Sequence, residues 1–238
     1  MNYLLPIRLN NQGAELLSQG KIKEARVILI KALNLTKLIT IEHRKIPHRN
    51  ERPTIEYVWL SRMPLDTPPD TFVYQRPIQI LEKKELAESK SLAADFTSAI
   101  VFNVSLGFHA QGLTSSRFLK KALHGYEISL ELRKHRRRAP NRVLDLALLN
   151  NIAHVHVELS EYSSAKPYFQ NVAYLLKHQN KKEMDAIELD GFTMGALWRQ
   201  PSCAPVAWIL LDQATFASCE SDRCLILSTS CYIIYILL

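Results

Sequence analysis

Apolar residues recur at helical spacing along three separate stretches of this chain, which span residues 6–39, about 98–135 and 146–179. In each stretch a small residue on one predicted helix is followed, on the next, by a small residue, a larger apolar residue and a third small or β-branched residue. The shared positions are Gly13/Ala25/Leu29/Ala32 in the first stretch, Ser105/Ala122/Tyr126/Ser129 in the second and Ala153/Ala165/Phe169/Val172 in the third. The pattern predicts three helix–turn–helix units.

The residue types at these positions predict how the helices pack. Gly13, Ser105 and Ala153 leave room for two helices to approach closely, and the larger residues Leu29, Tyr126 and Phe169 are expected to fill the gap between them. Glycine favours the left-handed conformation in which many helices end. We therefore expect Gly20 and Gly112 to end the first helix of their units, with Ser160 in that place in the third unit. Extra residues after Gly112 predict a longer turn in the second unit.

An insertion of about 55 residues, 40–94, separates the first unit from the second, and six of the eleven prolines fall between Pro47 and Pro77. Its two β-rich runs, 54–62 and 71–81, flank a turn-rich loop and predict a long-looped β-hairpin. Because two strands are rarely stable alone, we expect the hairpin to lean on the helices or to take residues 190–198 as a third strand. The alternative is an ordered insertion that binds nothing.

The three units resemble the tetratricopeptide repeat, a helix pair of about 34 residues. The third unit is most similar to the kinesin-light-chain type, with "NN" before its small residue and Pro167 two residues after Ala165. The strand "FVYQRPIQI" and the later "DGF" also resemble small repeat proteins of diatoms. The resemblance implies a mainly α fold, an α-α superhelix of helix pairs with a β-hairpin insertion between the first and second pairs. Stacked pairs of this kind leave a concave surface that binds other chains.

The resulting organisation is a first helix pair (1–39), the proline-rich insertion (40–94), the second and third pairs (95–180), a closing segment (181–207) and a tail (208–238) expected to be poorly ordered. The first residues show no apolar core of a signal peptide, since Arg8 interrupts them, and no run reaches the roughly 18 apolar residues of a membrane span. These features predict a cytoplasmic protein, with a nuclear location as the alternative.

Motifs of catalysis and metal binding are missing from the sequence. Three of the four cysteines lie in the tail, no CxxC pair occurs, and no phosphate-binding glycine loop, nucleophile elbow or HExxH is found. We therefore expect a non-catalytic protein with no cofactor and no metal ion.

The candidate binding residues are three asparagines, one in each unit. Asn11, Asn103 and Asn151 each stand two residues before the first small residue, a position that in tetratricopeptide proteins faces the groove. An asparagine amide offers one donor group and one acceptor to a peptide backbone, so we expect a ladder that reads main chain, with His109 and His154 adding side-chain selectivity. The alternative is that these residues are merely solvated. The lysines and arginines of a chaperone-tail clamp are absent from the matching places, which disfavours that ligand.

Charge supports a different function. The net charge is +7, and the run 133–142 holds six lysines and arginines with no acid. Such a run can neutralise phosphates or act as a nuclear address. The candidate nucleic-acid-binding residues are Arg133, Lys134, Arg136, Arg137, Arg138 and Arg142. The competing explanation is a solvated loop after a helix end, where cations are favoured.

Overall fold

The computed structural model describes residues 3–43, 55–64, 73–82, 93–112, 115–134, 142–178 and 191–193. The fold is mainly helical with a small two-stranded antiparallel sheet, as the sequence predicts. The helices are α1 (Leu4–Ser18), α2 (Ile22–His43), α4 (Ala93–Gly112), α5 (Ser116–Lys134), α6 (Arg142–Glu158) and α7 (Tyr162–Lys177), and the strands are β1 (Tyr57–Trp59) and β2 (Ile78–Ile80). The predicted tail, 208–238, lies outside the described residues.

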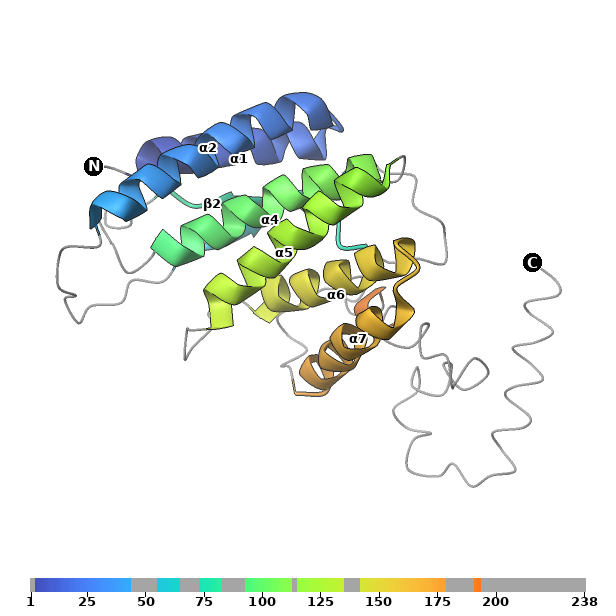
Figure 1. Ribbon diagram of the computed structural model, residues 1–238. Helices are drawn as coiled ribbons and strands as arrows, with labels where there is room; N and C mark the ends of the chain where they lie inside the picture. Colours follow the sequence, from blue (N-terminus) through green and yellow to red (C-terminus); the bar gives the residue numbers. More distant parts are fainter. Residues whose placement is uncertain are drawn as a thin grey trace, which may run out of the picture.

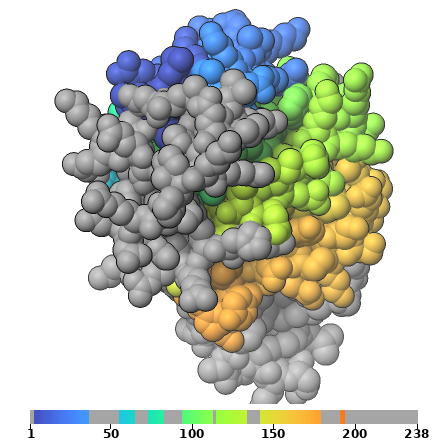
Figure 2. Space-filling view, turned by 60° about the vertical axis from the view of Figure 1, so that its left-hand side comes forward, coloured from blue at the N-terminus to red at the C-terminus, as the bar shows by residue number. Residues whose placement is uncertain are grey.

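The helices pack in the order in which they occur along the chain. α1 packs on α2, α4 on α5 and α6 on α7, while contacts of α2 with α4 and of α5 with α6 join one pair to the next. Figure 1 shows the pairs one below another, with β2 beside α1 and α4. The space-filling view gives the same order, blue to orange from top to bottom (Figure 2). The first helices of the three pairs, α1, α4 and α6, carry the three candidate asparagines.

Small residues hold the pairs together as the pattern predicts. Every residue of the shared positions is buried: Gly13, Ala25, Leu29, Ala32, Ser105, Ala122, Tyr126, Ser129, Ala153, Ala165, Phe169 and Val172. A Cβ atom added at Gly13 would lie 2.5 Å from Cγ of Leu29, closer than carbon atoms can approach. In the second pair, the Ser98 and Ser129 hydroxyls bond across the interface at 2.8 Å. The helices therefore touch where their side chains are smallest.

The turns inside the pairs are equally short. Three residues separate the helices in each pair, at 19–21, 113–115 and 159–161. The expectation of a longer turn after Gly112 is wrong, because the extra residues extend the helices α4 and α5 instead. Gly20 has a φ of 75° and Ser160 a φ of 62°, as expected of left-handed positions. Gly112 ends α4 as predicted, but its φ is not positive, and an added Cβ there would meet Leu119 of α5.

The hairpin forms as predicted, with shorter strands. Tyr57 pairs with Ile80 and Trp59 with Ile78 in antiparallel register. The third strand expected at 190–198 is wrong over 191–193, which are helical, and the other residues of that range lie outside the described part. Phe192 nevertheless closes the hairpin's apolar side, since it is fully buried and stacks on Tyr74 with ring centroids 5.2 Å apart.

The left-handed backbone at Ser160 predicts a stabilising substitution. A side chain in this conformation costs roughly 1–2 kcal/mol, and glycine avoids most of that cost while adding some unfolded-state entropy. We expect Ser160→Gly to raise the free energy of unfolding by about 0.5–1 kcal/mol in urea denaturation. The control is Ser163→Gly in α7, where glycine lowers helix stability. Equal losses in both variants would contradict the role given to the Ser160 backbone.

Candidate functional site

Three asparagine side chains, one from each helix pair, bind the main chain of the hairpin segment 73–80. Asn103 accepts from the Ile78 N–H at 2.9 Å and donates to the Ile78 carbonyl at 2.7 Å. Asn11 makes the same two bonds with Ile80 at 2.8 and 2.9 Å, and Asn151 makes them with Tyr74 at 2.8 and 3.0 Å. We call Asn11, Asn103 and Asn151 the asparagine ladder.

Each ladder amide replaces a neighbouring strand residue. In an antiparallel sheet, one residue exchanges an N–H···O and a C=O···H bond with its partner, and successive residues point their backbone groups to opposite edges. Ile78 and Ile80 point theirs to the asparagines. On the other edge, the Pro77 carbonyl accepts from the N–H of Leu60 at 2.9 Å, and β1 pairs with β2. The strand is thus satisfied on both edges, by β1 on one and by helix side chains on the other.

Further polar groups complete the ladder. Asn10 donates to the Ile78 carbonyl at 3.0 Å and accepts from Asn103 at 2.9 Å, which links α1 to α4. Asn151 also donates to the Tyr126 hydroxyl at 3.2 Å. Burial raises the pKa of Tyr126 above its usual value, which is already well above physiological pH, and this hydroxyl therefore keeps its proton. Both amide hydrogens of Asn103 and of Asn151 therefore have acceptors.

Apolar side chains of the hairpin fill the space beside the ladder. Tyr74, Ile78 and Ile80 are at most 1% exposed. Trp59 packs edge-on against Tyr74 and against Phe102 of α4, with ring centroids 5.0 and 6.1 Å apart. The site therefore combines main-chain recognition by amides with apolar contacts for the side chains of Tyr74, Ile78 and Ile80.

The two histidines proposed to add selectivity lie inside the helix packing. His109, 3% exposed, lies between the Tyr126 hydroxyl at 3.3 Å and the Glu158 carboxylate at 3.6 Å. His154, 2% exposed, packs edge-on against Phe169 of α7 with centroids 5.7 Å apart. Neither lies on an open surface, because each is enclosed by the second helix of its own pair.

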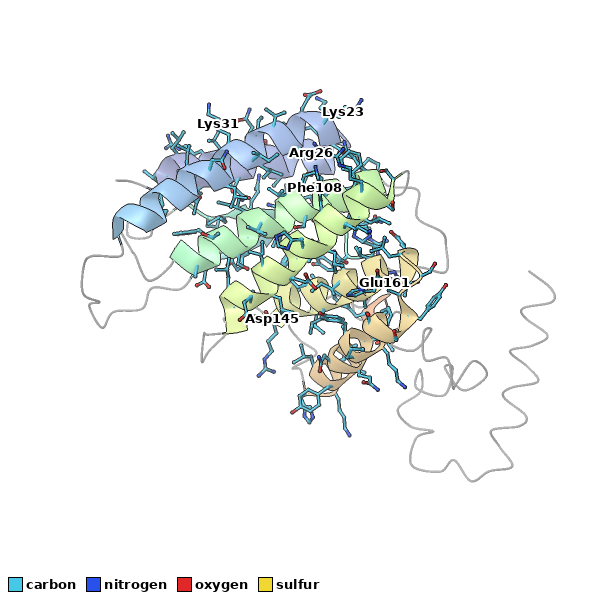
Figure 3. All side chains as sticks on the ribbon, in the orientation of Figure 1. Lys23, Arg26, Lys31, Phe108, Asp145 and Glu161 are labelled. Atoms are coloured by element: carbon cyan, nitrogen blue, oxygen red, sulfur yellow. The ribbon has the colours of Figure 1, made fainter. Side chains whose placement is uncertain are left out.

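The basic run is only partly available to an anion. Arg133 is buried and pairs with Asp145 at the start of α6, which Figure 3 labels. Burial lowers the pKa of Arg133, but the Asp145 carboxylate more than offsets this, and the net pKa is raised. Arg142 is exposed and donates to the His178 carbonyl at 3.0 Å. The Lys134 side chain and residues 136–138 lie outside the described part. Arg133 is therefore a structural cation, contrary to its predicted role.

A second basic surface, which sequence reasoning missed, lies on α5. Arg117, Lys120, Lys121 and His124, together with Ser116, line an open hollow of about 530 Å³. Lys121 lies 5.4 Å from the Phe108 ring centroid, and the Arg26 guanidinium lies 4.5 Å from it. Figure 3 shows Arg26 beside Phe108. The spacing of these four basic residues, at i, i+3, i+4 and i+7, was the available signal for one helix face.

Sequence reasoning also missed the parts of the site contributed by Asn10 and Tyr126, and above all the segment that the asparagines hold. The doubled asparagines at 10–11 and 150–151 were a signal of a polar cluster. Among the described residues no group of three potential metal ligands occurs, and no described helix has the length and apolarity to cross a membrane.

Comparison with known proteins gave no match: no family model, no curated protein and no solved structure is significantly similar to the chain.

The ladder predicts unequal losses of stability. Asn103→Ala leaves the buried N–H of Ile78 without its acceptor and takes one donor from the carbonyl, so we expect a loss of roughly 2–4 kcal/mol in the free energy of unfolding. Asn11 is half-buried, so water can replace part of the hydrogen bonding of its amide. Asn11→Ala is therefore expected to cost about 1 kcal/mol of the free energy of unfolding. Urea denaturation gives both values. Amide exchange should accelerate at Ile78 in the first variant and at Ile80 in the second. Losses of equal size, or no change at those amides, would refute the assigned bonds.

Proposed function

We propose that the protein is a non-catalytic protein-interaction adaptor, a tetratricopeptide-like superhelix whose concave groove holds an extended segment of a protein. Three features support the proposal. Helix pairs pack in series through small residues, the first helix of each pair carries one ladder asparagine, and each asparagine binds both the N–H and the C=O of one residue.

The amide pairs carry the proposal, because they are the contacts that a peptide-binding groove needs. They address N–H and C=O groups, which every residue except proline offers. In this chain the ladder bonds are formed with its own segment 73–80. A protein partner would bind in the same way, as an extended strand seated on α1, α4 and α6.

A position-specific crosslinking experiment tests the adaptor proposal. Glu15 is exposed on α1 beside the seated strand, where its carboxylate accepts from Gln79 at 3.1 Å. Val27 is 71% exposed on α2 of the same helix pair. We expect a photo-crosslinking amino acid at position 15 of the full chain to capture a protein from native cells that position 27 does not capture.

The crosslinked residues of the partner decide the outcome. An adaptor of the proposed kind gives a crosslink that maps to one short segment of the partner, and Asn151→Ala reduces the yield. Equal capture from positions 15 and 27, or capture from position 27 alone, would contradict groove binding.

The basic surface of α5 supports a second candidate function, association with nucleic acid in the cytoplasm or the nucleus. Its four basic side chains lie on one helix face, and no acid is found among the described residues that line the hollow. Arg26 and Lys121 already cover the Phe108 ring, so binding here would rest on phosphate contacts and would be independent of sequence.

Charge reversal tests this second function. We expect single-stranded RNA to bind with a dissociation constant that rises steeply with salt, and the double variant Lys120→Glu/Lys121→Glu to lower the log–log salt slope by about 1.5. The matched control is Lys23→Glu/Lys31→Glu on α2, which removes two exposed cations elsewhere (Figure 3). A salt-insensitive affinity, or the same effect in both double variants, would refute binding at α5.

A further inference from the structure

We infer that residues 73–80 occupy the groove as an internal pseudo-ligand that the partner can displace, and that the partner is an extended peptide with the same side-chain pattern. That pattern is an aromatic residue where Tyr74 lies and aliphatic residues where Ile78 and Ile80 lie. The inference rests on the proposed function of the groove and names the class of peptide that it takes.

Two kinds of contact hold the segment. Main-chain hydrogen bonds can be made by any extended peptide, whereas side-chain contacts distinguish one peptide from another. The six ladder bonds need only an extended main chain without proline at the positions of Tyr74, Ile78 and Ile80. Selection comes from the side chains of these same residues, which are buried. Arg76 and Gln79 are half-buried and bond to hairpin carbonyls and to Glu15, so their positions tolerate other polar residues.

The order in which the ladder asparagines bond to the segment fixes the direction of the peptide. Tyr74 binds Asn151 of the third pair, Ile78 binds Asn103 of the second, and Ile80 binds Asn11 of the first. A partner therefore runs with its amino end at α6 and its carboxyl end at α1. Beyond the last rung, Arg8 of α1 forms an ion pair with Glu82 at 3.1 Å, which favours an acidic residue two positions after the final aliphatic one.

The packing allows the segment to be replaced while the helices stay in place. The seated strand belongs to the insertion between α2 and α4, and these two helices contact each other directly. Release of the strand removes its contacts with α1 and α4 and exposes Phe102 and the ladder amides, whereas the direct contacts of α2 with α4 and of α5 with α6 do not involve it. A partner with the same pattern restores both kinds of contact.

Covalent attachment gives the chain's own segment an advantage over a separate peptide. A tethered ligand acts at an effective concentration in the millimolar range. The apparent affinity for a separate peptide is lowered by the fraction of molecules in which the seat is open. Weakening the internal strand should therefore strengthen binding of an external one.

The test uses the full chain and a fluorescent peptide of residues 73–82, VYQRPIQILE. The double variant Ile78→Asp/Ile80→Asp places two carboxylates at buried positions and expels the internal strand. The matched control is Val58→Asp, the same type of change at a residue 39% exposed on the same hairpin. A second peptide carries N-methyl groups at the residues that correspond to Ile78 and Ile80, which removes the donors to Asn103 and Asn11 and keeps the side chains.

Fluorescence anisotropy should show that the double variant binds the peptide at least ten-fold more tightly than the wild-type chain or Val58→Asp does. The N-methylated peptide should lose at least ten-fold in affinity for the double variant. If the double variant loses helical circular dichroism, addition of the unmodified peptide should restore it, because a ligand of the folded state stabilises that state.

Equal affinity of the double variant and the wild-type chain, indifference to N-methylation, or failure of the peptide to restore lost helicity would each overturn the inference. These results are independent of the crosslinking experiment on the wild-type chain. Peptide exchange without a cellular crosslink at position 15 would refute the adaptor and leave exchange standing. A crosslink at position 15 without peptide exchange would overturn the displacement of residues 73–80 and leave a partner that binds beside the seated strand rather than in its place.

Discussion

A buried strand must have both of its edges hydrogen-bonded, and this requirement explains the centre of the molecule. An unpaired backbone group away from water costs about as much as the bond it lacks. β1 satisfies one edge of β2, and a third strand would be the usual solution for the other. Here Asn11 and Asn103 satisfy the second edge from the helices. Asparagine suits the task because its side chain carries the same donor and acceptor as a peptide unit.

Close helix packing makes this arrangement possible. Gly13 lets α1 approach Leu29 of α2, and Ala153 and Phe169 pack in the same way in the third pair. These contacts fix the positions of α1, α4 and α6, and with them the spacing of the asparagines. The ion pair between buried Arg133 and half-buried Asp145 adds a contact between the second and third helix pairs. Removing one partner of such a pair leaves the other charge without compensation. The resulting loss of stability is larger than the net contribution of the intact pair.

The helices, the hairpin and the buried small residues could be predicted from the sequence because each depends on local spacing. Gly13 and Leu29 are sixteen residues apart in a helix–turn–helix, and their contact follows from that geometry. The asparagines could be chosen from their place before each small residue together with the resemblance to tetratricopeptide repeats. Their ligand could not, since Asn151 and Tyr74 are 77 residues apart and no local pattern relates them. His109 and His154 are polar and were therefore expected on the surface. Tyr126 and Phe169 of the second helices enclose them, and this packing cannot be seen in the local sequence pattern.

The ladder asparagines bond to Ile80, Ile78 and Tyr74, which are two and four positions apart along the segment 73–80. This uneven spacing has a mechanical consequence. The shorter interval lies within β2, where a strand advances roughly 3.3 Å per residue and Ile78 and Ile80 are about 7 Å apart, whereas the longer interval spans residues 74–77, which are not part of a strand. The strand is stiff in this direction, whereas stacked helix pairs can bend relative to one another. The segment 73–80 thus links α1, α4 and α6 through one continuous piece of chain that belongs to none of the helix pairs.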